Sequence, residues 1–340
     1  MALKLGVLDQ SPIGRGEDAV VAFKHTLELA RAADRLGYSR FWVSEHHDTT
    51  GLAGSSPEVL LAAIGANTSR IRIGSGGVLL PHYSPYKVAE NFRVLEALYP
   101  GRCDLGIGRA PGGMLLASIA LRNGAPKPPE ERFPETLREL GAYLESGPPL
   151  GPEHPLAELR ATPRVGTVPE IWLLGSSGYS AAVASRMGAG FSFAHFINGY
   201  GGQGAVWDYM RSFRPGPLGT KPRVNACVFV ICADTDAIAE REAASMDLRL
   251  LYHEKGEFGR PFPTAEEAAA YPYSEWDRAR IADNRKRMIV GGPDRVRKAL
   301  AAFADSYRTD EVLVTCIMSD FRLRVRSYEL LAELIGLKGH

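Results

Sequence analysis

The length, composition and charge of the chain limit what it can be. Its 340 residues exceed a minimal domain, and one α/β barrel of roughly 250 to 400 residues would take up all of them. A hydrophobic fraction of 45% and a charged fraction of 23% exclude a disordered chain. With 40 basic and 39 acidic side chains the net charge is +1, which argues against nucleic acid or an acidic membrane as a partner. We therefore expect a small-molecule partner.

The cysteines indicate a reducing environment. Cys103, Cys227, Cys232 and Cys316 all fall in apolar stretches, and no Cys-x-x-Cys motif occurs. No secretory leader is expected ahead of Leu3, and no apolar stretch approaches the roughly 20 residues that span a bilayer. The sequence thus predicts structural thiols in a cytoplasmic protein without a membrane segment.

Short apolar strands alternate with amphipathic helices along the chain. Strands are predicted over residues 3–8, 40–44, 71–80, 103–107, 171–174, 190–196, 224–232 and 312–316. The helices between them are predicted over residues 17–36, 56–67, 85–98, 179–187, 205–213, 236–253, 294–307 and 321–335. This alternation predicts a parallel sheet, and eight units favour a closed barrel over an open sheet.

Two stretches interrupt this pattern. Residues 110–169 carry helical pieces among Pro-rich and Gly-rich segments, and residues 261–273 are irregular as well. The predicted fold class is therefore an α/β protein, a (β/α)8 TIM barrel with irregular insertions after strand 4 and after strand 7. Since no linker or repeat divides the chain, residues 1–340 are expected to form a single domain. In such barrels the chemistry sits just after the carboxyl ends of the strands.

The second predicted strand is followed by Glu45, His46, His47 and Asp48. Adjacent side chains of an extended chain point to opposite faces, so the two histidines are poorly placed to ligate one metal ion, and no metal site is predicted. One imidazole could simply cap a helix or pack in the barrel wall. At a strand end, however, an imidazole that titrates near neutrality suits proton transfer.

The third strand carries Gly74, Gly76 and Gly77 within an otherwise β-branched and Leu-rich run. Glycine weakens a strand interior, so this cluster indicates a bulge or a place where a flat ligand lies against bare backbone. Barrel curvature alone would also account for it.

The fourth and fifth strands point to an anion site. Arg109 follows the fourth strand, and arginine is suited to bidentate phosphate binding, although one arginine can equally form a salt bridge on the rim. The fifth strand runs through Ser176, Ser177, Gly178, Tyr179 and Ser180 into a helix. Free backbone N–H groups and hydroxyls at a helix start bind anions, while an ordinary serine N-cap is the alternative. We expect one phosphate between the two strands.

A second glycine cluster resembles a dinucleotide-binding motif but lacks one part of it. Residues 199–204 match the Gly-x-Gly-x-x-Gly dinucleotide pattern, but the acidic residue expected about 20 positions later is replaced by Pro222, Arg223 and Val224. We interpret these residues as a loop. The loop and the Pro/Gly-rich stretch before Ile171 are both candidate lids over the barrel mouth.

These strand ends resemble the bacterial luciferase-like family of flavin-dependent monooxygenases over nearly the whole chain. The matching segments cover residues 41–47, 72–81, 101–109, 171–177, 213–215 and 291–293, in the family's order. The resemblance implies a (β/α)8 barrel that binds FMN, with reduced FMN supplied by a separate flavin reductase, and a homodimer through early barrel helices.

The resemblance also assigns roles to residues. The histidine that matches His46 acts as an acid or base where the flavin reacts with oxygen. The pair that matches Gly76 and Gly77 carries a non-proline cis peptide under the flavin ring. The phosphate contacts of the family fall on Arg109 and on residues 177–180, which is the site that the spacing indicates.

Departures from the family keep the substrate open. Relatives often carry Asn at the position of Asp48 and Thr-Asp at Gly113 and Met114, and the Cys of true luciferases is replaced by Gly108. The last change argues against light emission. The expected activity is FMN-dependent oxidation of a small organic molecule by O2. A deazaflavin-dependent oxidoreductase and a non-catalytic flavin-binding protein are the alternatives.

Overall fold

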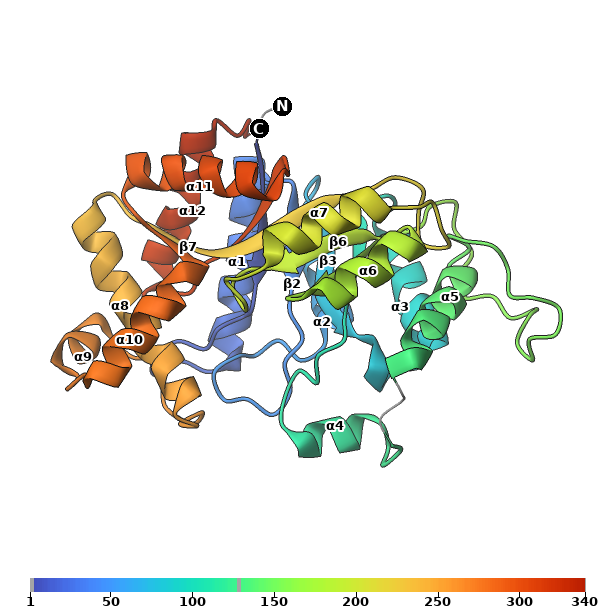
Figure 1. Ribbon diagram of the computed structural model, residues 1–340, viewed down its shortest axis with the longest axis horizontal. Helices are drawn as coiled ribbons and strands as arrows, with labels where there is room; N and C mark the ends of the chain where they lie inside the picture. Colours follow the sequence, from blue (N-terminus) through green and yellow to red (C-terminus); the bar gives the residue numbers. More distant parts are fainter. Residues whose placement is uncertain (1–2, 127–129, 340) are drawn as a thin grey trace.

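A closed barrel of eight parallel strands forms the centre of the molecule (Figure 1). The structure is a computed structural model and describes residues 3–126 and 130–339. Around the barrel the order is β1-β2-β3-β4-β5-β6-β7-β9, closed by pairing of β9 with β1. The strands are β1 (Lys4–Asp9), β2 (Arg40–Val43), β3 (Arg72–Leu79), β4 (Cys103–Gly108), β5 (Glu170–Gly175), β6 (Gly190–Ala194), β7 (Val224–Cys232) and β9 (Glu311–Thr315). The predicted (β/α)8 TIM barrel is confirmed.

Helices surround the barrel and fill the insertions. They are α1 (Ala19–Leu36), α2 (Pro57–Ala66), α3 (Pro85–Leu98), α4 (Leu115–Leu121), α5 (Phe133–Tyr143), α6 (Gly178–Met187), α7 (Gly202–Ser212), α8 (Asp236–Glu254), α9 (Ala265–Ala270), α10 (Glu275–Asn284), α11 (Pro293–Tyr307) and α12 (Phe321–Ile335). The bounds of α1 follow from its sequence. The Asp18 side chain accepts a hydrogen bond from the N–H of Val21, and Gly37 ends the helix with a φ of 85°, which favours glycine.

The two insertions leave the barrel at the predicted places. The first follows β4 and contains α4 and α5, while the second follows β7 and contains α8, α9 and α10. A short strand that the sequence did not predict, β8 (Met288–Gly291), pairs with the last four residues of β7, Phe229–Cys232, outside the closed ring. The nine-residue β7 is long enough to pair with β6 and β9 over its first part and with β8 over its last part.

The barrel interior is layered. At its amino end the buried Asp104 carboxylate lies 2.6 Å from Nη1 of Arg40 and 2.6 Å from Nη2 of Arg72. Above this layer Trp42 and Trp172 meet edge to face at 5.6 Å, and the guanidinium of Arg40 lies under both rings. These two layers fill the barrel interior below the carboxyl end of the strands, where the chemistry of such barrels lies.

None of the helices of the described residues is both long and apolar enough to cross a bilayer. The four cysteines are buried, and none is in a disulfide.

Candidate active site

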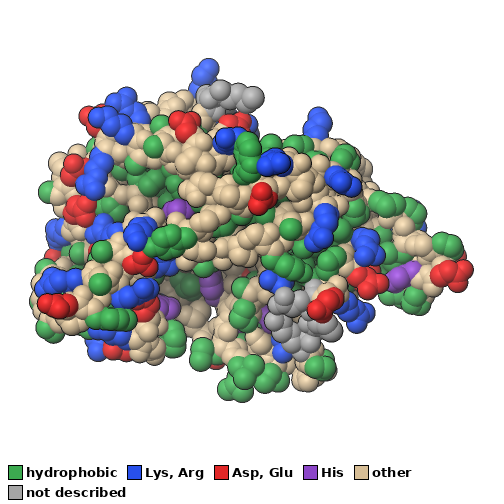
Figure 2. Space-filling view, in the orientation of Figure 1, with side chains coloured by type: hydrophobic (Ala, Val, Ile, Leu, Met, Phe, Trp, Pro, Cys, Tyr) green, Lys and Arg blue, Asp and Glu red, His purple; other side chains and the backbone are tan. Residues whose placement is uncertain are grey.

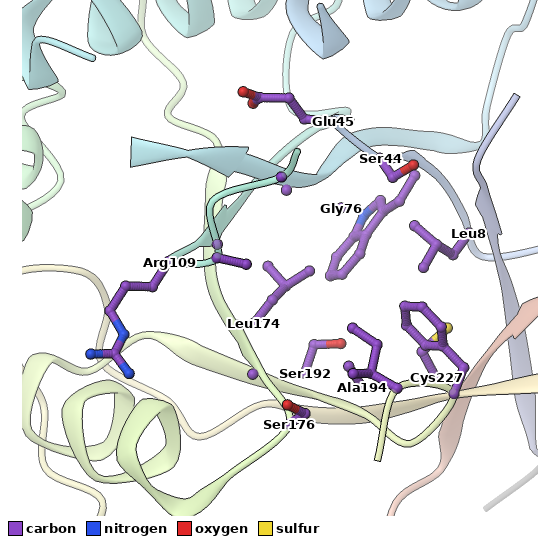
Figure 3. Close-up of a pocket in the computed structure, with 18 of the residues that line it drawn as sticks. Leu8, Ser44, Glu45, Gly76, Arg109, Leu174, Ser176, Ser192, Ala194 and Cys227 are labelled. Carbon is purple, nitrogen blue, oxygen red and sulfur yellow. The ribbon is translucent and has the colours of Figure 1, made fainter. Parts of the chain in front are cut away.

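Strand ends from all around the barrel line a cavity of about 350 Å³, called here the inner cavity. Its floor is made of Leu8, Trp42, Cys227 and Leu313 from four strands. Figure 3 shows Leu8 and Cys227 on one side of the open space and the Arg109 side chain on the other. The cavity is therefore apolar at the barrel axis and cationic at one edge.

Six of the eight residues predicted to bind a cofactor line the inner cavity. They are Gly76, Gly77, Arg109, Ser176, Ser177 and Ser180. Gly178 and Tyr179 are not part of its lining. Instead, the Tyr179 ring lies under the guanidinium of Arg109, with Cζ 3.9 Å from the ring centroid. The cationic group is thus held beside the start of α6.

The start of α6 borders the inner cavity through Ser177 and Ser180. Ser177 is the N-cap residue in an extended conformation, and its hydroxyl makes no capping hydrogen bond. Nδ2 of Asn198 donates to the carbonyl of Ser176 at 2.9 Å, which anchors the segment after β6 next to this corner. A helix start beside an arginine is a chemically suitable phosphate site, because the helix dipole and the guanidinium both favour an anion there.

The glycines of β3 bring bare backbone to the cavity wall. The Gly76–Gly77 peptide bond is cis, as the family resemblance implies, and the register with β4 shifts between Gly76 and Val78. A Cβ on Gly77 would lie 2.6 Å from the carbonyl oxygen of Gly106. A side chain is therefore excluded there, and a flat ring can approach the backbone.

A network of hydrogen bonds fixes the segment after β2. The buried Glu45 accepts hydrogen bonds from the hydroxyl of Tyr83 at 2.7 Å and from the N–H of Leu79 at 3.0 Å, and Nε2 of His47 lies 2.7 Å from its Oε1. In Figure 3 the Glu45 carboxylate points away from the open space of the cavity. Glu45 and His47 therefore position the segment, and the role of facing the ligand falls to His46.

His46 lies at the border of the inner cavity. Its Nδ1 is 3.0 Å from the hydroxyl of Ser44, and the described residues provide no hydrogen-bond partner for Nε2. Burial lowers the pKa of His46 to about 4, and the neighbouring His47 and His253 add to this effect. The imidazole is therefore neutral at neutral pH and has a nitrogen to offer to a ligand.

A second cavity of about 550 Å³, called here the outer cavity, adjoins the first. The two share Gln10, His46, Gly112, Phe196 and Ile197, and the remaining walls of the outer cavity come mainly from the loop after β2 and from residues 246–262. Figure 2 shows a hollow that contains histidine side chains between the lobe of α8 to α10 and the helix α4. His46 thus faces two adjoining spaces.

The expectation that the Pro/Gly-rich stretch before Ile171 covers the mouth is wrong. Among the described residues between Leu115 and Glu170, none lines either cavity. The buried Arg93 of α3 donates to the carbonyls of Val165 and Thr167, both at 3.3 Å, and so draws this stretch to the outside of the barrel. The cavities are bordered instead by residues 46–52, 110–114 and 258–262.

The described residues contain no cluster of three or more His, Cys, Asp or Glu side chains arranged to hold a metal ion. The chemistry available at the mouth is that of a cationic corner, exposed backbone and a neutral imidazole. This set fits FMN, because the arginine and the start of α6 suit its phosphate. The backbone of Gly76 and Gly77 in β3, called here the glycine wall, suits its ring.

Known proteins resemble this chain along its whole length. The family model for luciferase-like monooxygenases matches residues 3–310. The N-acetyl-S-alkylcysteine monooxygenase of Bacillus subtilis is 37% identical over 334 residues, which cover 98% of each chain.

Solved structures agree with these matches. The crystal structure of apo-MsnO8 superposes with a TM-score of 0.89 at 41% identity and covers 99% of this chain and 100% of its own. The oxygenating constituent of 3,6-diketocamphane monooxygenase from Pseudomonas putida, solved with FMN, shares the fold at a TM-score of 0.71 and 22% identity, with 99% of each chain covered. This protein belongs to the luciferase-like monooxygenase family.

Proposed function

We propose that this protein is an FMN-dependent monooxygenase that uses reduced FMN and O2 to oxidise a small organic substrate. The observation that carries the proposal is the meeting of Arg109, the start of α6, the glycine wall of β3 and His46 in one cavity. When bound, reduced FMN supplies the two electrons with which O2 delivers one oxygen atom to the substrate and the other to water.

The proposed roles of the residues follow from their chemistry. Arg109, Ser176, Ser177 and Ser180, with the N–H groups of Gly178 and Tyr179, bind the phosphate. The backbone of Gly76 and Gly77 supports the flavin ring. His46 holds or accepts a proton at Nε2, and its neutral state at neutral pH leaves that nitrogen ready to accept one. The apolar floor of the inner cavity excludes water from the reacting atoms.

Partners are part of the proposal. A separate flavin reductase is the proposed source of reduced FMN. A homodimer would cover the outer faces of α2 and α3, where Val59, Val94 and Leu98 are 74%, 47% and 55% exposed.

N-acetyl-S-alkylcysteines are the first substrates to test, because a relative of 37% identity is named for them. For such a substrate, the proposed reaction transfers one oxygen atom of O2 to the substrate and reduces the other to water.

The test begins with anaerobic titrations of the protein with reduced FMN, oxidised FMN and a reduced deazaflavin. Oxygen uptake and incorporation of ¹⁸O from ¹⁸O2 are then measured with a flavin reductase and N-acetyl-S-benzylcysteine. We expect reduced FMN to bind most tightly, and His46→Ala to keep FMN affinity within a few fold while it slows substrate oxidation.

Two results would overturn the proposal. Preferred binding of the deazaflavin with turnover but without oxygen uptake would assign a deazaflavin oxidoreductase. Tight binding of oxidised flavin, without oxygen uptake for any member of a substrate panel, would assign a flavin-binding protein.

A further inference from the structure

The outer cavity contains an arginine whose charge is not balanced by the protein. Arg249 lies on α8, is only 7% exposed and lines this cavity. Its guanidinium donates through Nη1 to the carbonyl of Arg260 at 2.9 Å. Within the described residues, no carboxylate comes within 4.0 Å of it. Burial accordingly lowers the pKa of Arg249.

The other charged groups of the outer cavity do not supply this balance. Arg287 adds positive charge at the border with the inner cavity, where its Nη1 donates to the carbonyl of Ile197 at 3.1 Å. Asp48 is the one carboxylate among the lining residues; it is exposed and pairs with neither arginine. His253 stands beside Arg249, and burial lowers the pKa of its imidazole. The cavity is therefore cationic at neutral pH.

The chain makes room for this guanidinium in a specific way. A Cβ on Gly51 would collide with Nη2 of Arg249, so the glycine lets the loop after β2 lie directly against the guanidinium. A buried charge costs several kcal/mol unless it is paired, so natural chains rarely retain one without a counter-charge. A ligand anion in the outer cavity would provide the missing partner.

Apolar side chains form much of the remaining wall of the outer cavity. Its walls include Met246, Leu250, Phe258, Phe262 and Ile317. A ligand in this space would pack its apolar portion against these side chains and place its anionic group at Arg249 of α8. Its reacting atom would then lie toward His46, which lines both cavities.

We propose that the substrate of this protein carries a carboxylate or sulfonate, which Arg249 binds in the outer cavity, joined to an apolar portion that extends toward His46. This inference rests on the proposed monooxygenase function, since it assigns the outer cavity to the substrate and the inner cavity to FMN. It makes Arg249 the residue that selects anionic over neutral substrates.

The test is calorimetric binding to the protein without and with FMN. The probes are 4-phenylbutanoate, 3-phenylpropane-1-sulfonate and the neutral 4-phenylbutanamide. We expect the wild type to bind at least one of the anions about tenfold or more tightly than the amide, the scale of a charge-assisted hydrogen bond. Arg249→Met should abolish this preference and Arg249→Lys should retain part of it.

A matched control and a stability measurement separate binding from folding. Arg241→Met changes an exposed arginine of the same helix, one that pairs with Glu266, and should leave the preference unchanged. Arg249→Met should unfold at the same or a higher urea concentration than the wild type, because it removes a buried charge that has no carboxylate partner.

Any of four results would overturn the inference. The wild type could bind the anions and the amide equally, or bind none of the probes. The preference for anions could survive in Arg249→Met, or that variant could lose much of its stability, which would show that the arginine has a structural role. FMN binding without anion preference would remove this inference and leave the proposed function standing. Anion preference without FMN binding would remove the proposed function and leave Arg249 as an anion site without an assigned reaction.

Discussion

The arginines that close the amino end of the barrel and Arg249 at the carboxyl end are held differently. At the amino end Arg40 and Arg72 share the buried Asp104, and Nε of Arg40 also lies 2.9 Å from Glu311. At the carboxyl end Arg249 contacts a backbone carbonyl, and no carboxylate of the described residues pairs with it. The difference teaches that the stabilising arginines Arg40 and Arg72 have their counter-charge built in, whereas Arg249, which is proposed to bind the substrate, leaves that place to the ligand.

Loss of the built-in counter-charge should have the largest effect on folding. Asp104→Asn leaves two buried or half-buried arginines facing an amide, and removal of one partner from a buried pair costs about 3–5 kcal/mol. The free energy of unfolding from urea denaturation measures this loss. Asp310→Asn, which breaks an exposed pair with Lys4, is the control and should cost less than about 1 kcal/mol. Equal effects of the two variants would show that the amino-end network does not stabilise the barrel.

The pH dependence of stability tests whether His46, at the carboxyl end of the barrel, is buried in its neutral form. The native state holds the pKa of His46 near 4, below its usual value of 6.5, so between these values the unfolded chain binds more protons. The free energy of unfolding should therefore fall as the pH drops from about 6.5 to 4, with His46 contributing up to about 3 kcal/mol.

Urea denaturation across this pH range is the measurement. His46→Gln should show a shallower fall than the wild type. A residual slope is expected in the variant, because burial also lowers the pKa of His195 and of His253. A variant as pH-dependent as the wild type would contradict the burial of a neutral His46.

Arg109→Ala should weaken FMN binding more than it affects folding, whereas Asp104→Asn should act mainly on folding. Loss of a charge-assisted contact to the FMN phosphate should cost about 1.5–3 kcal/mol of binding free energy. Fluorescence titration with FMN measures the dissociation constant. Arg186→Ala, which changes an exposed arginine of α6, should bind FMN like the wild type. An unaltered dissociation constant for Arg109→Ala would mean that the FMN phosphate binds elsewhere.

The smallest expected effect concerns the glycine wall. In Gly77→Ala the new Cβ would lie 2.6 Å from the carbonyl oxygen of Gly106 and 3.0 Å from the N–H nitrogen of Gly108. Because both neighbours are backbone, we expect a loss of about 1–3 kcal/mol in the free energy of unfolding. Gly178→Ala has open space around the new Cβ and should fold like the wild type. Equal stability of the two alanine variants would mean that β3 adjusts freely.

The sequence was sufficient for the barrel and for much of the inner cavity. Parallel strands of a barrel bring their carboxyl ends together, so residues that directly follow the strands, such as Arg109 and Ser176, could be expected to meet. The barrel strand bounds were also predicted closely, because short apolar runs ended by glycine or proline mark them.

Other features could be recognised only from the structure. β8 is only four residues long, and it pairs with the carboxyl end of the nine-residue β7. The unusual length of β7 was the one feature of the sequence that indicated an additional partner strand. Arg249 stands within a predicted helix, between Leu248 and Leu250, and arginine is a residue type that is mostly solvent-exposed. Its burial arises from the packing of α8 against the loop after β2, which periodicity does not reveal.

The two cavities draw their walls from different parts of the chain. The inner cavity is built from strand ends distributed around the whole ring, whereas much of the outer one comes from a single continuous segment, residues 246–262. Changes in that segment would alter the space beside His46 without moving a barrel strand. Under the proposed function, substitutions in this one segment would therefore change which substrate is accepted and leave the proposed cofactor site unchanged.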